Sequence, residues 1–226
     1  MQEFLKIYKI FFDDTQVGVL DYTPYRNPDC TEFFENSVIR KLVLDGAHQD
    51  AEYFGVVSYS LRNKMDLSRK WGKDIANTSI TYFTPELFES VLKERKPDVL
   101  SFQRHPAHDN VSYADQFHPN FSKFFREIMR NIGYDWHPQT LRHVVYSNFF
   151  VAKSEIYERF VREMLDPAMD VMSKMPELRA NSRYPKRLPV NLQRKFGLPH
   201  YPYHTFLCER MFSYYAHINN LNCLNY

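Results

Sequence analysis

The stretch "AEYFGVVSYSLRNKM", residues 51–65, decides how the rest of the chain is interpreted. Residues 53–58 within it combine two aromatic residues, a glycine, two valines and a serine without any charge, which is typical of a buried β-strand. Hydroxyl and basic side chains follow directly: Ser58, Ser60, Arg62 and Lys64. A buried strand that ends in hydroxyls and cations, without a carboxylate, indicates a site for an anionic ligand.

Strands and helices are predicted to alternate on both sides of this stretch. Apolar runs typical of strands lie at residues 5–12, 79–83, 97–102 and 142–153. Apolar residues at helical spacing lie at residues 30–44, 84–96, 120–133, 154–175 (with a bend at Pro167) and 205–218. The segments 13–30 and 176–203 are expected to be loops. The alternation predicts an α/β, Rossmann-like fold with a mostly parallel central sheet flanked by helices.

The expected ligand site follows from this topology. Ligands of open α/β sheets bind outside the carboxyl ends of the strands. Residues 13–16, 58–64 and 101–110 follow predicted strands, and the Asn148 region is expected to join them. The sequence therefore predicts one site built from segments that lie far apart along the chain.

The composition favours a single globular domain over residues 1–226. With 226 residues, 44% of them hydrophobic and 25% charged, the chain can bury a sizeable core. Cys30, Cys208 and Cys223 form no CxxC pair, so neither a zinc site nor a disulfide framework is indicated. We expect reduced thiols and a cytoplasmic protein without a transmembrane segment, because no apolar run approaches about 18 residues.

The stretch "QRHPAHDN", residues 103–110, follows the strand predicted at 97–102. His105, His108 and Asp109 can bind a metal, contact sugar hydroxyls, or act as a general base, since a histidine accepts a proton near neutral pH. The alternative is a polar loop that caps the next segment, and the HxxH spacing alone is a weak indication of a metal site.

Two further polar residues interrupt apolar segments. Asn148 lies within the strand-like run "YSNFFVAK", and an unpaired buried amide costs about 1–3 kcal/mol. It therefore either contacts a ligand or satisfies neighbouring backbone. Glu209 lies between apolar residues on the last predicted helix, where a catalytic carboxylate and an internal ion pair with Arg210 are both open.

The segment 178–197 carries six basic residues and no acidic one: Arg179, Arg183, Lys186, Arg187, Arg194 and Lys195. Three interpretations remain open. It can be a lid that closes over a diphosphate, a surface for an anionic polymer, or a solvated loop.

Six stretches together carry a resemblance to a known family through their order and spacing: "IYKIFFD", "FFENSVIRKLV", "AEYFGVVSYSLRNKM", "PDVLSF", "VVYSNFFVAKSEIYERFV" and "LCERMFSYY". In this order, over roughly residues 5–215, the chain resembles bacterial and viral capsular-polysaccharide glycosyltransferase-like proteins. Their first characteristic motif is tyrosine-tyrosine-glycine-hydrophobic-serine followed by a basic run. Their second is serine-asparagine, two aromatic residues and then valine-alanine-lysine.

The resemblance implies a GT-A-like hexosyl- or pentosyltransferase with a nucleotide-sugar half at about residues 1–110 and an acceptor half at about 111–226. The donor would be a UDP- or GDP-sugar and the acceptor a glycan or glycoprotein, with no nucleic acid. Tyr8 and Asp13 would contact the nucleotide. The diphosphate would contact the hydroxyls and cations of residues 58–64, with Arg183 and Lys186 on the lid. His105, His108, Asn148 and Glu209 would surround the sugar and acceptor.

One departure from that family bears on the chemistry. GT-A enzymes usually place an Asp-x-Asp motif where this chain has Ser58-Tyr59-Ser60, and hydroxyls alone hold Mg²⁺ or Mn²⁺ weakly. Arg62 and Lys64 can neutralise a diphosphate in place of the metal, or they can belong to a solvated loop. The missing carboxylates also keep a second class open, a non-enzymatic α/β module that binds an anionic polymer such as nucleic acid.

Overall fold

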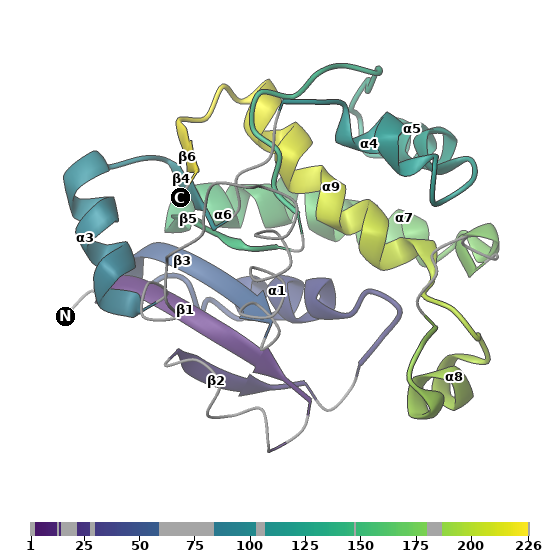
Figure 1. The fold of residues 1–226 in the computed structure, drawn as a ribbon, viewed down its shortest axis with the longest axis horizontal. Coiled ribbons are helices and arrows are strands. Elements are labelled where there is room, and N and C mark those ends of the chain that lie inside the picture. Colours follow the sequence, from purple (N-terminus) through teal and green to yellow (C-terminus); the bar gives the residue numbers. More distant parts are fainter. Residues whose placement is uncertain are drawn as a thin grey trace, which may run out of the picture.

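The computed structural model describes residues 3–12, 14, 22–27, 30–58, 84–102, 107–146, 148–179 and 187–225. Their strands form one six-stranded sheet with the order β2-β1-β3-β5-β4-β6 (Figure 1). The strands are β1 (Glu3–Phe11), β2 (Thr23–Arg26), β3 (Ala51–Ser58), β4 (Val99–Ser101), β5 (Phe150–Lys153) and β6 (Cys223–Asn225). The α/β class is confirmed, and the strand predicted at residues 79–83 lies outside the described residues.

The expectation of a mostly parallel sheet was wrong, because the sheet is mixed. The pairs β1–β2, β1–β3 and β4–β6 are parallel, whereas β5 runs antiparallel to both β3 and β4. The physical reason is the connection from β4 to β5: the chain re-enters the sheet beside the carboxyl end of β4, so β5 runs in the opposite direction. The start of β5 therefore lies beside the carboxyl ends of β3 and β4, and Phe102 N donates to Phe149 O at 2.9 Å.

Helices cover both faces of the sheet (Figure 1). They are α1 (Glu35–Leu44), α3 (Pro85–Arg95), α4 (Asn110–Ala114), α5 (Phe121–Asn131), α6 (Ser154–Phe160), α7 (Asp166–Met172), α8 (Val190–Phe196) and α9 (Tyr203–Ile218). One face packs on Phe88 and Leu92 of α3. The other face packs on α1, α6 and α9, where the ring of Phe150 stacks on Phe212 with centroids 3.7 Å apart.

Several helix boundaries follow from local chemistry. Thr84 caps α3 as predicted, since its hydroxyl accepts from Leu87 N at 3.4 Å, and Pro85 occupies the first turn. The long helix predicted at residues 154–175 is interrupted near Pro167: a π-helical turn, Val161–Leu165, separates α6 from α7. A proline has no N–H for the helical hydrogen-bond ladder, so an irregular turn next to it is expected.

The strand predicted at residues 142–153 was too long, because only Phe150–Lys153 pairs in the sheet. Upstream, the hydroxyl of Ser213 on α9 accepts from Val145 N at 2.9 Å and donates to Val145 O at 3.1 Å. This side chain satisfies the backbone groups that a neighbouring strand would otherwise pair. The prediction of loops at residues 13–30 and 176–203 was also incorrect in part, because the first contains β2 and the second contains α8.

Gly55 in β3 allows β3 and β5 to approach closely. A Cβ at this position would lie 2.5 Å from Val151 Cγ1 and 3.1 Å from the Phe150 carbonyl oxygen. We expect Gly55→Ala to lower the free energy of unfolding by about 1–3 kcal/mol, measured by urea denaturation, because the packed centre of the sheet has to shift. In the double variant with Val151→Ala the loss should be smaller than the sum of the two single losses. Additive losses would contradict this account.

Candidate functional site

The edge where β3 ends and β5 begins carries two of the predicted site residues. Ser58 is buried at the end of β3, opposite Ile10 of β1. Tyr146 and Asn148 belong to the turn that precedes β5, in which Phe149 N donates to Tyr146 O at 3.2 Å. Asn148 has a φ of 57°, in the left-handed region that asparagine tolerates better than most residues. This one short turn therefore carries two polar side chains, those of Tyr146 and Asn148.

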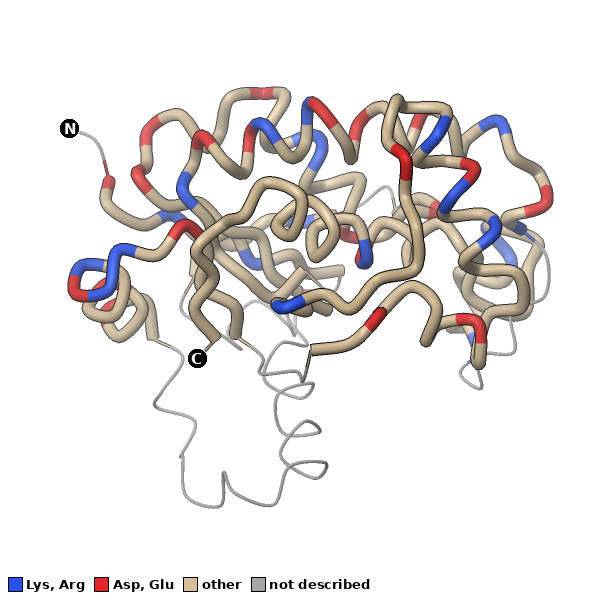
Figure 2. The backbone as a smooth tube through the Cα atoms, turned by 90° about the horizontal axis from the view of Figure 1, so that it is seen from above, with Lys and Arg blue, Asp and Glu red and all other residues tan. Residues whose placement is uncertain are grey.

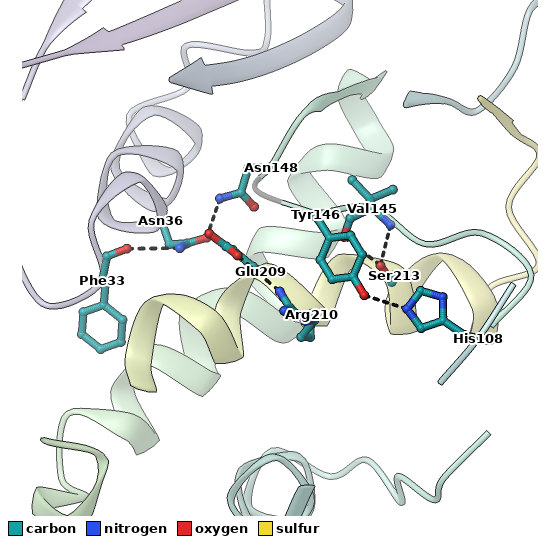
Figure 3. Close-up of polar contacts among 9 residues, drawn as sticks. All are labelled: Phe33, Asn36, His108, Val145, Tyr146, Asn148, Glu209, Arg210 and Ser213. Carbon is teal, nitrogen blue, oxygen red and sulfur yellow. Dashed lines mark hydrogen bonds and ion pairs between the residues drawn. The ribbon is translucent and has the colours of Figure 1, made fainter. Parts of the chain in front are cut away.

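Asn148 is held by α1. Its amide nitrogen donates to Asn36 Oδ1 at 3.0 Å, and the amide of Asn36 donates to Phe33 O at 3.1 Å (Figure 3). Both asparagines are buried. The sequence left open a ligand contact or a contact with neighbouring backbone; the hydrogen bond present is instead to the Asn36 side chain, and it fixes the Asn148 amide.

A second set of polar contacts starts from Tyr146. Its hydroxyl lies 2.7 Å from His108 Nε2, on the segment that follows β4. The guanidinium carbon of Arg210 lies 4.4 Å from the centre of the Tyr146 ring, in a cation–π contact. Arg210 Nη1 in turn lies 3.3 Å from Glu209 Oε2. Six of the residues that Figure 3 labels make these two separate sets of contacts, and we call them the polar row: Asn36, Asn148, Glu209, Arg210, Tyr146 and His108.

Burial shapes the electrostatics of the polar row. The pKa of Tyr146 is raised by burial, and the opposing charge of Arg210 does not cancel this effect. Tyr146 therefore keeps its proton at neutral pH, so its hydroxyl can donate to His108 Nε2. The side chains of Arg210 and Glu209 are 12% and 15% exposed, so solvent ions screen this ion pair only weakly.

The predicted site residues fall into three groups. His108, Asn148 and Glu209 belong to the polar row, and Ser58 lies at the same edge of the sheet. Tyr8 lies further back in β1, where its ring packs against Tyr25 and Phe54, with centroids 6.2 and 5.9 Å away. The others lie outside the described residues: Asp13, Ser60, Arg62, Lys64, His105, Arg183 and Lys186.

Sequence reasoning missed Asn36 and Tyr146. Asn36 lies on the buried face of α1 together with Val38, Ile39 and Val43. A polar residue on the apolar face of a helix was the signal that could have identified it. Tyr146 carried no such signal, because a tyrosine in an apolar run is ordinarily part of a core. The ion pair between Arg210 and Glu209 is present, as one of the two readings proposed.

Among the described residues, no group of three or more His, Cys, Asp or Glu side chains is placed to hold a metal ion. At the end of β3, Ser58 supplies a neutral hydroxyl.

Neither the surface charge nor the surface pockets of the described residues indicate a second site as clearly as the polar row does. Lys and Arg are interspersed with Asp and Glu along the described chain (Figure 2). In the predicted lid, Arg179 donates to Phe196 O at 2.6 Å and lies 3.3 Å from Glu32, so it is tied to its surroundings. A hollow of about 450 Å³ lies between β1, Tyr22 and α3, away from the polar row.

The fold and the polar row define an α/β protein whose mixed sheet carries a buried polar cluster at one edge. The chain matches no family model, no curated protein and no solved structure. None of the helices that the structure describes is long and apolar enough to cross a membrane.

Proposed function

We propose that the chain is a GT-A-like glycosyltransferase that moves a sugar from a UDP- or GDP-sugar to a glycan or glycoprotein acceptor. One observation carries the proposal. His108, Asn148 and Glu209 come from three distant segments, yet all three belong to the polar row at the edge of the sheet where Ser58 ends β3. That edge is where open α/β sheets bind ligands.

The proposed transfer uses the Tyr146–His108 pair as its base. The acceptor oxygen forms a bond to the anomeric carbon while the bond from that carbon to the diphosphate oxygen breaks. The acceptor proton passes to the Tyr146 oxygen, whose own proton passes across the 2.7 Å contact to His108 Nε2. The diphosphate leaves with the electron pair of the broken bond, so charge and atoms balance.

The other members of the polar row would position the sugars. Glu209 can accept a hydrogen bond from a sugar hydroxyl, and Arg210 holds this carboxylate in place at 3.3 Å. Asn148 is fixed by Asn36 and would present its remaining amide groups to the donor or acceptor. Ser58 would contact the diphosphate.

The proposal is tested by a thermal-shift panel of UDP- and GDP-sugars with and without Mn²⁺. At a hundredfold excess over Kd, a true donor stabilises the folded protein by about 2–3 kcal/mol. Stabilisation only with Mn²⁺ would defeat the metal-free arrangement but not the transfer reaction. Binding to DNA that weakens steeply with salt, with no stabilisation by any nucleotide sugar, would instead favour the anionic-polymer module.

A further inference from the structure

A series of aromatic rings leads from the polar row to the surface of the protein. The Tyr146 and His108 rings are stacked with centroids 6.0 Å apart. His108 meets Tyr113 of α4 edge-on at 5.7 Å, and Tyr113 meets Phe117 edge-on at 5.7 Å. We call these four residues the ring series.

The outer half of the ring series is open to solvent. Tyr113 is 47% exposed and Phe117 is 41% exposed, although both are large and largely apolar. Neighbouring exposed aromatic rings are a common mark of a binding surface, whereas scattered single ones are not. The exposed pair therefore extends the proposed site outward from His108.

The segment that carries the outer rings offers no cation to an anionic partner, whereas Arg210 lies 4.4 Å from the inner ring, that of Tyr146. Residues 107–121 contain no Lys or Arg, and their acidic residues are Asp109 and Asp115. Asp109 caps α4 by accepting from Val111 N and Ser112 N at 3.1 and 3.0 Å. Asp115 accepts from Ser122 N at 3.1 Å and from its hydroxyl. A phosphate-bearing polymer would find acidic groups here and no cation on this segment.

A buried amide lies within the same segment. Asn110, the first residue of α4, is 0% exposed, and neither of its side-chain amide atoms has a hydrogen-bond partner among the described residues. Unpaired buried amides are rare in folded proteins, and each invites a specific explanation such as a ligand or a bound water. Because Asn110 is fully buried, a bound water is the simplest partner for its amide, and a surface ligand is inferred from the exposed rings.

We propose that Tyr113 and Phe117 bind a neutral oligosaccharide, which rests on the proposed function and identifies its acceptor as a glycan chain. A pyranose ring has an apolar C–H face that packs on an aromatic ring and hydroxyl groups around its rim. The sugars stack on Tyr113 and Phe117, and the terminal sugar reaches the Tyr146–His108 pair along the ring series. Acceptor length beyond one sugar then contributes to binding.

The test titrates the full chain with neutral hexasaccharides, namely β-1,4-glucan, β-1,3-glucan, α-1,4-glucan and α-1,6-mannan, by saturation-transfer NMR and calorimetry. We expect at least one of them to bind and Tyr113→Leu/Phe117→Leu to weaken that binding about tenfold or more, from the loss of ring stacking. Tyr113→Phe keeps the ring and should retain binding. The matched control, Val190→Ser on α8, alters an apolar side chain that is 63% exposed and should leave binding unchanged.

The outcomes separate this proposal from the transferase proposal. Failure of all four hexasaccharides to bind, or equal binding by the wild type and the double variant, would overturn the glycan site even where nucleotide sugars stabilise the protein. Glycan binding that the double variant loses, with no stabilisation by any nucleotide sugar, would support the glycan site and defeat the transferase. Loss of folding in the double variant would be visible as a changed urea midpoint, and Tyr113→Leu alone then carries the comparison.

Discussion

His108→Gln is expected to lower the rate of sugar transfer by about 10²–10⁴-fold while leaving the thermal shift with the donor sugar unchanged. Under the proposed function, His108 receives the acceptor proton through the Tyr146 hydroxyl, 2.7 Å from Nε2. A positioned general base contributes rate enhancements of this size. Glutamine keeps a polar group at the position but cannot take up a proton at neutral pH. The measurement is initial transfer rate at saturating donor, with unfolding by urea as a check on the fold.

Tyr146→Phe provides a matched variant for the same step. It keeps the ring that contacts Arg210 and removes only the hydroxyl that links the acceptor to His108. A comparable loss of rate is expected. His137→Gln, an exposed histidine outside the polar row, is the control and should retain full activity. A His108→Gln protein as active as the control would exclude His108 as the base.

The stability of the protein is expected to fall by about 2–4 kcal/mol between pH 6.5 and pH 4 through His118 alone. Burial, aided by the charge of Arg210, lowers the pKa of His118 from 6.5 to about 4. The imidazole is 3% exposed and lies 4.2 Å from the ring of Phe206, centre to centre. The unfolded chain therefore binds more protons than the folded chain in this window, so stability decreases as pH falls through it.

His118→Phe should remove this part of the pH dependence. The measurement is the free energy of unfolding by urea at pH 7, 6, 5 and 4 for the wild type and the variant. A residual slope is expected, because burial also lowers the pKa of His143 and His204 and because carboxylates titrate near pH 4. The exposed control His137→Gln should follow the wild-type curve. Parallel curves for the wild type and His118→Phe would show that His118 does not resist protonation.

The fold was predictable from the sequence where the decisive chemistry is local. Thr84 and Pro85 marked the start of α3, and the apolar spacing of α5 and α9 matches their buried faces. The direction of β5 was not predictable, because it depends on which edge of the sheet the chain re-enters after α5. The length of β5 was overestimated for a related reason: Ser213, 68 positions after Val145, replaces a neighbouring strand.

The candidate site was predictable to a similar extent. His108, Asn148 and Glu209 drew attention because polar residues interrupt apolar runs or follow a strand. Their contacts with Tyr146, Arg210 and Asn36 were not predictable, since the partners come from separate helices and turns. The distance between Tyr146 and His108 is set by the packing of the β4–β5 connection against α9, which no short stretch of sequence encodes.

The outermost strands of the described sheet have a consequence for behaviour at high concentration. β2 has four residues with Pro24 among them, and β6 has three. A proline offers no N–H to an incoming polypeptide, and so short a strand presents few free backbone groups. Neither of these two outer strands is therefore a good template for amyloid-like association of the folded chain.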